Sequence, residues 1–163
     1  MRTLPVLLAA VFLALTTSTG AYAQLADKKV LTLAAVKEIA NAAEAEAKRN
    51  GWNLVIVVVD DGGNLLYLER MDGVQLGSIA IATQKARTAA FYRRPTKEFA
   101  DRMAGGSNTA IAMPDVMPLE GGLPIVVDGQ TIGAVGASGA TGAQDAQAAQ
   151  AGVAALMAKL GRP

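Results

Sequence analysis

The chain has 163 residues, with 15 Lys or Arg and 14 Asp or Glu, a length that suits a single domain. It contains neither cysteine nor histidine. This excludes disulfides, thiol nucleophiles, imidazole bases, metal sites built from Cys or His, and a haem held by a proximal histidine. Any chemistry must therefore use carboxylates, Lys, Arg, hydroxyls, Met or backbone groups, and we predict no metal site.

The start of the chain has the pattern of a secretory signal peptide. Arg2 precedes an apolar run over residues 4–15, and residues 21–23 (Ala-Tyr-Ala) form a small-x-small cleavage site. The run is shorter than the roughly 20 residues that a transmembrane helix needs. We therefore predict residues 1–23 as a signal peptide and residues 24–163 as one domain, periplasmic or secreted, without a membrane span after cleavage.

The predicted mature chain has a balanced charge. Removing Arg2 leaves 14 basic and 14 acidic residues. A neutral chain without a basic run argues against a nucleic acid partner. It also lacks the charge excess that keeps small proteins apart, so we expect a homo-oligomer.

The first half of the domain predicts a helix and a hairpin. Residues 26–31 form a lead-in that we interpret as a candidate edge strand. Thr32 then caps a helix of helically spaced apolar residues that ends at Asn50-Gly51. A β-branched run within 53–60 predicts a central strand covered on both faces, and a glycine-rich turn leads to a returning strand at 65–70.

Two helices follow. Ser78 is the expected cap of a helix to about Tyr92, in which alanines form the buried stripe while Lys85 and Arg87 point elsewhere. Thr96 is the expected cap of a short third helix that ends near Met103.

The last third contains a long connection, a hairpin and a helix. Residues 107–122 are apolar without a predicted element, so we expect them to pack over a pocket or an interface. Strands are predicted at 123–127 and 131–137, and a final helix at about 143–160. The order predicts an α/β (α+β) sandwich with about five antiparallel strands and helices on at least one face.

Three segments are candidate binding sites. The small residues from Ser138 and Gly139 to the last helix leave backbone N–H groups that can bind a carboxylate or phosphate, although tight helix–sheet packing explains them as well. Arg93 and Arg94, with Thr96, can clamp a carboxylate, or form a solvated corner or an ion pair between subunits.

The third candidate is Glu120 before Gly121 and Gly122. A carboxylate positioned by a Gly-Gly turn in an apolar loop can serve as a catalytic acid or base or line a binding site. The alternative is a surface carboxylate beside glycines that only the turn requires. Gln144 and Asp145, in the first turn of the last helix, are interpreted as capping residues.

Taken together, the motifs resemble those of one family. They are Val57-Val58-Val59-Asp60-Asp61-Gly62-Gly63-Asn64, Lys85-Ala86-Arg87-Thr88-Ala89, Arg94-Pro95-Thr96, Gly121-Gly122-Leu123-Pro124-Ile125, Ile132-Gly133-Ala134-Val135-Gly136-Ala137-Ser138-Gly139-Ala140 and Gln144-Asp145. In this order and spacing the chain resembles the GlcG/HbpS family over about residues 30–160.

The resemblance implies a profilin-like antiparallel sheet, assembly into oligomers up to an octamer, and, for some members, haem binding. Because this chain has no histidine, any haem would bind without histidine ligation, through Tyr67, Tyr92, a Met, a Lys or a Thr.

Three functions remain open from the sequence. The first is an exported oligomeric protein that binds haem or another carboxylate-bearing small ligand. The second is a small-molecule lyase or isomerase with Glu120 as acid/base, Arg94 as anchor and the amides at Ser138 and Gly139 as oxyanion donors. The third is a structural or sensory accessory protein.

Overall fold

The computed structural model describes residues 25–162, so residues 1–24 and 163, and with them the predicted signal peptide, lie outside the described residues. The elements follow the predicted order, with one 3-10 turn added in the long connection. They are α1 Leu33–Arg49, β1 Val55–Asp60, β2 Leu65–Arg70, α2 Ser78–Tyr92, α3 Lys97–Ala104, η1 Thr109–Ala112, β3 Gly122–Val127, β4 Gln130–Ser138 and α4 Gly142–Lys159.

The sheet is antiparallel and has four strands in the order β2-β1-β4-β3. The α+β prediction is confirmed, but five strands is one too many, because the lead-in 26–31 pairs with no strand. A Cβ built on Gly133 of β4 would stand 2.6 Å from Leu31 Cδ1. Leu31 thus packs on the face of β4, and the lead-in crosses the sheet instead of extending its edge.

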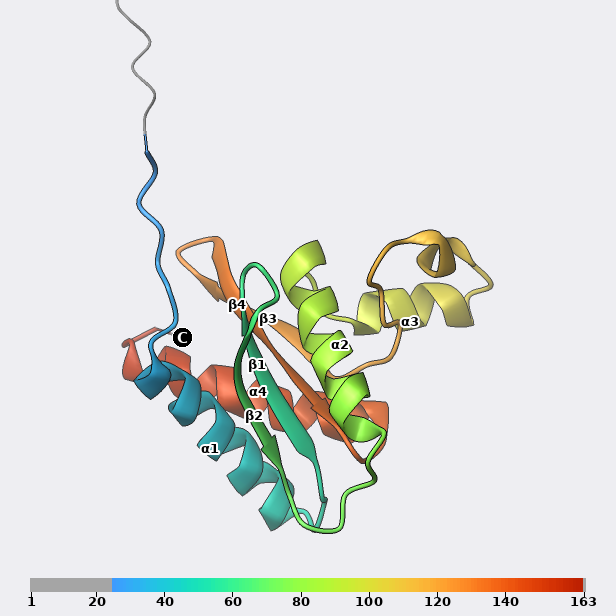
Figure 1. Cartoon of the computed structure of the whole chain (residues 1–163), viewed down its shortest axis with the longest axis horizontal. Helices are drawn as coiled ribbons and strands as arrows, with labels where there is room; N and C mark the ends of the chain where they lie inside the picture. The colour runs from blue at the N-terminus through green and yellow to red at the C-terminus, as the bar shows by residue number, and fades with distance from the viewer. Residues whose placement is uncertain (1–24, 163) are drawn as a thin grey trace, which may run out of the picture.

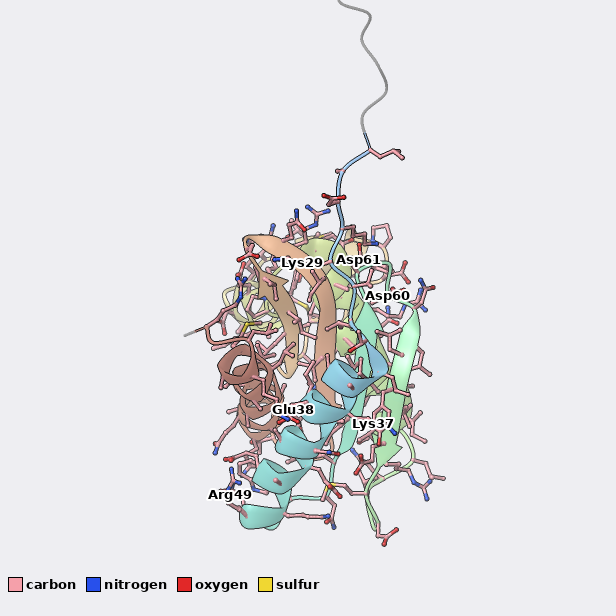
Figure 2. The ribbon with its side chains drawn as sticks, turned by 90° about the vertical axis from the view of Figure 1, so that its left-hand side faces the viewer. Lys29, Lys37, Glu38, Arg49, Asp60 and Asp61 are labelled. Atoms are coloured by element: carbon pink, nitrogen blue, oxygen red, sulfur yellow. The ribbon has the colours of Figure 1, made fainter. Side chains whose placement is uncertain are left out.

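Exposed ion pairs connect the lead-in to two turns of the sheet. Lys28 bonds to Asp61 in the β1–β2 turn at 2.7 Å, and Lys29 bonds to Asp128 in the β3–β4 turn. Figure 2 shows Lys29 and Asp61 at the same end of the molecule, and Arg49, the last residue of α1, at the opposite end.

Helices cover both faces of the sheet, with α1 and α4 on one side and α2 on the other (Figure 1). In β1, Ile56 and Val58 pack toward α1 and α4, whereas Val55, Val57 and Val59 pack toward α2. All five side chains are fully buried, and each such side chain contributes roughly 1.5–3 kcal/mol. The prediction of a central strand covered on both faces is confirmed.

Helix α2 lies unusually close to β4. A Cβ on Gly136 would stand 2.2 Å from the Ala82 carbonyl oxygen and 2.7 Å from the Ala86 nitrogen. Only glycine permits this approach, which places Lys85 of α2 against the end of β4 where Ala137 and Ser138 lie.

The helix ends agree with the predictions in part. Thr32 caps α1 by accepting the Ala35 N–H at 3.2 Å, and Gln144 forms a capping box with Thr141 at the start of α4. The cap predicted at Ser78 is wrong, because Gly77 holds the N-cap position of α2. Thr96 does hold the N-cap position of α3, as predicted, but its side chain makes no capping bond. Among residues 25–162, no helix has both the length and the apolar character to cross a membrane.

Candidate functional site

A buried ion pair joins α2 to α4. Lys85 Nζ lies 2.7 Å from Asp145 Oδ2, and each side chain is only 3% exposed. The ammonium also donates to the Ala137 carbonyl oxygen at 3.0 Å, and Asp145 Oδ1 accepts the Ala140 N–H at 3.0 Å. The expectation that Lys85 points away from the buried stripe is therefore wrong.

This arrangement stabilises two charged side chains that are buried from solvent. Burial raises the pKa of Asp145, while the Lys85 ammonium and the N–H groups of Ala140 and Gly139 oppose that rise. Because one buried charge without its partner is strongly unfavourable, Lys85 and Asp145 depend on each other. The backbone groups complete their hydrogen bonding.

Asp145 also explains the segment predicted to bind an anion. The N–H groups of Gly139 and Ala140, which precede α4, bond to the Asp145 carboxylate. The anion at this helix end is therefore part of the protein. Of the amides at Ser138 and Gly139 that the enzyme hypothesis uses as oxyanion donors, that of Gly139 is therefore directed to Asp145, and the role of the Ser138 amide stays a prediction.

The Gly-Gly turn after Glu120 passes directly over the ion pair. Gly121 has φ +124°, and a Cβ there would stand 2.8 Å from Lys85 Nζ, from Asp145 Cβ and from the Ala137 carbonyl oxygen. A Cβ on Gly122 would stand 2.4 Å from the Lys85 carbonyl oxygen. Both glycines are needed for close packing around the ion pair, and their predicted contact with a ligand stays a prediction.

The ion pair forms part of the wall of a cavity of about 230 Å³, which we call the Glu120 cavity. Glu120 is half-buried there, and Ser138 is 4% exposed and donates to Ser78 Oγ at 3.4 Å. The side chains that line the cavity include those of Ile81, Lys85, Leu119, Glu120, Ser138 and Asp145. The structure thus brings together Glu120 and Ser138, which were predicted, with Lys85 and Asp145, which were missed as site residues.

The two arginines lie apart from this cavity. Arg93 is exposed at the end of α2 with φ 53° and lines a different cavity beside Asp61. Arg94 donates to the Tyr92 carbonyl oxygen at 3.2 Å and its guanidinium lies 5.8 Å from the centre of the Phe99 ring. The structure therefore does not bring the two guanidiniums together, and their ligand role stays a prediction.

Two further predicted residues have structural partners. The buried Thr96 hydroxyl accepts the Gly122 N–H at 2.9 Å, and the Thr96 N–H donates to the Gly122 carbonyl oxygen at 3.0 Å. Gly139 has φ +150°, and a Cβ there would stand 2.2 Å from the Asn53 carbonyl oxygen. Thr96 thus ties the α2–α3 corner to β3, and Gly139 allows β4 to pass close to Asn53.

Periodicity contained a signal for the missed lysine. Lys85 follows Ala82 by three residues and precedes Ala89 by four, so it falls on the face that the alanines bury. A lysine on a buried helical face needs a carboxylate partner. The sequence did not identify that partner, because Asp145 lies 60 residues away.

The fold and the cavity define the class, which is an α+β protein with a small polar cavity built on a buried ion pair. Residues 31–154 match the family model described as "Haem degrading protein HbpS-like". The chain belongs to this HbpS-like family, which confirms the resemblance found in the sequence.

Individual relatives also match the chain, in sequence and in structure. Protein GlcG of Escherichia coli is 47% identical over 108 residues, which span 66% of this chain and 81% of GlcG. The crystal structure of a double mutant of Streptomyces reticuli HbpS matches with TM-score 0.74 and 32% identity, over 94% of this chain and 97% of that one. A crystal structure titled as a PduOC–haem complex matches with TM-score 0.72 and 28% identity, over 78% of this chain and 95% of that one.

Haem does not fit the Glu120 cavity. Its 230 Å³ falls below the roughly 300–1,000 Å³ of sites for drug-sized ligands. The residues that line it include no His, Cys, Met or Tyr, the usual axial ligands of haem iron. Of the tyrosines named as alternatives, Tyr92 donates its hydroxyl to the Pro114 carbonyl oxygen and Tyr67 donates to Glu69. Among the described residues, no three His, Cys, Asp or Glu side chains gather as a metal site would require.

Proposed function

We propose that this protein is an exported, oligomeric member of the HbpS-like family that binds a small carboxylate-bearing ligand in the Glu120 cavity. The observation that carries the proposal is the Lys85 ammonium. It has three N–H donors, and among the described residues two of them bond to Ala137 and Asp145. Because Lys85 lines the cavity, the third donor can bond to an oxygen atom of a ligand.

The other side chains specify the ligand further. Ile81 and Leu119 supply apolar wall, while Glu120 places a second carboxylate in the cavity. A ligand that carried only a carboxylate would be repelled by Glu120. A ligand that also carries a hydroxyl satisfies both ends of the cavity, because its carboxylate bonds to Lys85 and its hydroxyl donates to Glu120.

Calorimetric titration with lactate and propionate tests this proposal, because the two acids differ only by the hydroxyl. We expect lactate to bind at least about tenfold more tightly, as one charge-assisted hydrogen bond provides. Glu120→Gln, which keeps a neutral acceptor, should reduce this preference, and Glu120→Ala should remove it; both should leave the fold intact. Lys37→Gln, a change at an exposed lysine of α1 outside the cavity lining, is the matched control. Equal binding of both acids by the unchanged protein would rule out the role of Glu120.

Haem is the second candidate ligand, favoured by the family description and by the PduOC–haem neighbour. Because the Glu120 cavity does not fit it, haem would bind elsewhere, and the arrangement we propose is a surface completed by a second copy. A haemin titration followed in the Soret band should then saturate at a defined ratio, with a change in mass by light scattering. No Soret shift at tens of micromolar haemin would exclude this candidate.

An enzymatic function is favoured by one observation, the shared cavity of Glu120 and Lys85. Glu120 would transfer a proton at the carbon beside a carbonyl, and Lys85 would stabilise the negative charge that develops on the oxygen. Glu120→Gln should abolish turnover of any substrate while leaving binding to Lys85 measurable. Turnover that survives this change would exclude Glu120 as the acid or base.

Export has a direct test of its own. Cleavage after Ala23 would produce a mature chain that starts at Gln24. That chain would have the neutral net charge from which we expect self-association. Mass spectrometry of the protein recovered from outside the cytoplasm should find this terminus, and a chain that retains Arg2 there would contradict the proposal.

A further inference from the structure

A second cavity lies where the two ends of the described chain come together. It is enclosed by the lead-in, the start of α1, the β3–β4 hairpin and the end of α4. Its volume is about 330 Å³, within the roughly 300–1,000 Å³ of small-molecule sites. We call it the terminal cavity and define it by Lys29, Leu31, Val127, Leu156, Leu160 and Arg162. None of these residues lines the Glu120 cavity.

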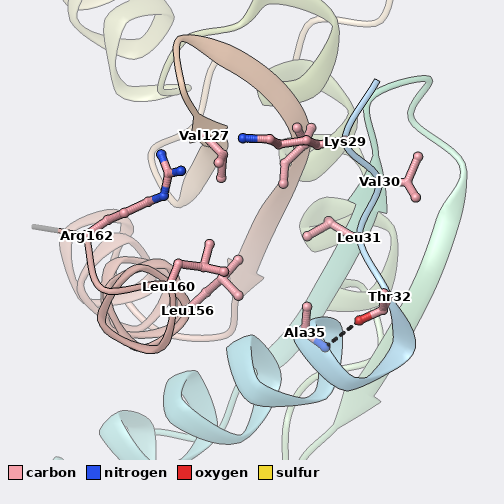
Figure 3. Close-up of a pocket in the computed structure, with 10 residues that line it drawn as sticks. Lys29, Val30, Leu31, Thr32, Ala35, Val127, Leu156, Leu160 and Arg162 are labelled. Carbon is pink, nitrogen blue, oxygen red and sulfur yellow. Dashed lines mark hydrogen bonds between the residues drawn. The ribbon is translucent and has the colours of Figure 1, made fainter. Parts of the chain in front are cut away.

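The interior of the terminal cavity is aliphatic and its rim is cationic. Figure 3 shows Leu31, Leu156 and Leu160 around the open space, while the ends of Lys29 and Arg162 extend toward each other past Val127. The residues that line it include no His, Cys, Met or Tyr, which are the usual axial ligands of haem iron. Of the less usual ligands considered for this chain, Lys29 is bonded to Asp128 and the Thr32 hydroxyl caps α1. A ligand for this cavity must instead combine an aliphatic body with one acidic end.

The rim carries an excess positive charge. Lys29 and Arg162 both bond to the same carboxylate, that of Asp128, with Arg162 Nη2 at 3.0 Å from Asp128 Oδ2. Among the residues that the structure describes, two cations therefore share one anion. The nearby Lys159 bonds to Glu38 instead. The first turn of α1 contains no acidic residue, so the positive end of its dipole is not offset locally.

The contacts that close the rim are easily exchanged. The side chains of Lys29, Arg162 and Asp128 are 51%, 37% and 48% exposed. Exposed ion pairs of this kind contribute little to stability, so the carboxylate of a ligand can take a place beside Asp128 without unfolding the hairpin. A guanidinium can bind such a carboxylate with two N–H groups at once.

From this geometry we infer a second binding site, which takes a medium-chain aliphatic carboxylate. The hydrocarbon chain lies among Leu31, Val127 and Leu156, and the carboxylate lies between Lys29 and Arg162. The site is separate from the Glu120 cavity in residues and in ligand chemistry, so neither proposal depends on the other.

Titration with decanoate, followed by the methyl NMR signals of Leu and Val, tests this site. We expect saturable shifts at Leu31, Val127 and Leu156, and none at Leu68, which packs with the α2 side of the sheet. In the series from hexanoate to decanoate, each added methylene should tighten Kd about fourfold while the chain still finds room in the cavity. 1-Decanol, which has the same chain without the charge, should bind at least tenfold more weakly.

Variants separate the charged end from the apolar body. Lys29→Gln and Arg162→Gln should each weaken decanoate binding about tenfold and leave 1-decanol binding unchanged. Lys159→Gln is the matched control, since it removes a cation of the same helix end that does not line the cavity. Leu160→Gln should weaken both ligands, and because Leu160 is 48% exposed the protein should still fold. Glu120→Gln should change neither ligand.

Four results would overturn the inference. They are the absence of saturable shifts below the concentration at which decanoate forms micelles, equal binding of decanol and decanoate, equal weakening by Lys159→Gln, and shifts of the cavity methyl groups on dilution without decanoate. The last result would assign the cavity to a contact between two copies of the chain.

Discussion

At the scale of single residues, Asp145 serves two functions. Its carboxylate neutralises Lys85 and also accepts the N–H groups that precede α4. A carboxylate at a helix N-terminus is favourable on its own, and here the same group also makes the burial of an ammonium possible. One side chain thus links α2, β4 and α4 at the wall of the Glu120 cavity.

Removing Asp145 should therefore be costly. We predict that Asp145→Ala lowers the free energy of unfolding by about 3–5 kcal/mol, because it leaves the Lys85 charge buried and without a partner. Urea denaturation measures this loss. The double change Lys85→Met with Asp145→Leu should recover most of it, since it removes both charges.

The exposed pair Lys97–Asp101 gives a matched control. Its atoms lie at 2.6 Å, close to the distance in the buried pair, but both side chains are more than half exposed. Asp101→Ala should change stability little. A loss for Asp145→Ala that is no larger than for Asp101→Ala would contradict the role of burial.

A pH dependence should arise at Glu69 of β2. Burial raises the pKa of Glu69, the Tyr67 hydroxyl bond opposes this rise, and Glu44 adds to it. A group with a raised pKa in the fold contributes stability that is present below its ordinary value of 4.5 and is lost as pH rises through the raised pKa.

Glu69→Gln should remove this loss. The variant should gain stability relative to the unchanged protein when the pH is raised from about 4 to about 8, as urea midpoints at each pH would show. A constant difference between the two proteins across this range would contradict the assigned direction.

At the scale of the elements, local signals were sufficient for most of the fold. Thr32 and Gly51 marked the ends of α1, and the β-branched run marked β1, because caps and side-chain periodicity act within a few residues. Ser78 is not the cap of α2, and Thr96 is the N-cap residue of α3 without a capping bond. Each hydroxyl has a tertiary partner instead, Ser138 and Gly122. Such long-range partners also explain why the Lys85–Asp145 pair was missed.

The lead-in shows the same limit of prediction from local sequence. Residues 26–31 were interpreted as a candidate edge strand, but Ala, Asp and Lys, which strands disfavour, make up most of the segment. Leu31 packs on β4, and the exposed ion pairs of Lys28 and Lys29 connect the segment to two turns. Its position therefore depends on the assembled sheet.

The close approach of α2 and β4 can be tested by one methyl group. We predict that Gly136→Ala destabilises the protein by about 1–3 kcal/mol, because the new Cβ would stand 2.2 Å from the Ala82 carbonyl oxygen and force the helix away. It should also weaken ligand binding at Lys85. Gly77→Ala is the matched control, since a Cβ there meets nothing within 4 Å. Equal stability of the two variants in urea would contradict the packing argument.

At the scale of the whole molecule, the described surface exposes more large apolar side chains than folding explains. Leu65 and Leu66 are 57% and 37% exposed on β2, which forms one edge of the sheet. An edge strand has backbone N–H and C=O groups available for pairing with another chain. With the neutral charge of the predicted mature chain, these features favour self-association through β2.

We therefore predict that the mature protein forms oligomers and that lysines on β2 weaken them. Light scattering should find a mass that is a multiple of that of the chain, and the double change Leu65→Lys with Leu66→Lys should lower it, because charged side chains prevent pairing along an edge. Leu76→Lys, at a residue 72% exposed before α2, is the control for added charge alone. A monomer at every concentration would contradict self-association, whereas an oligomer that both variants leave intact would place the contact elsewhere than β2.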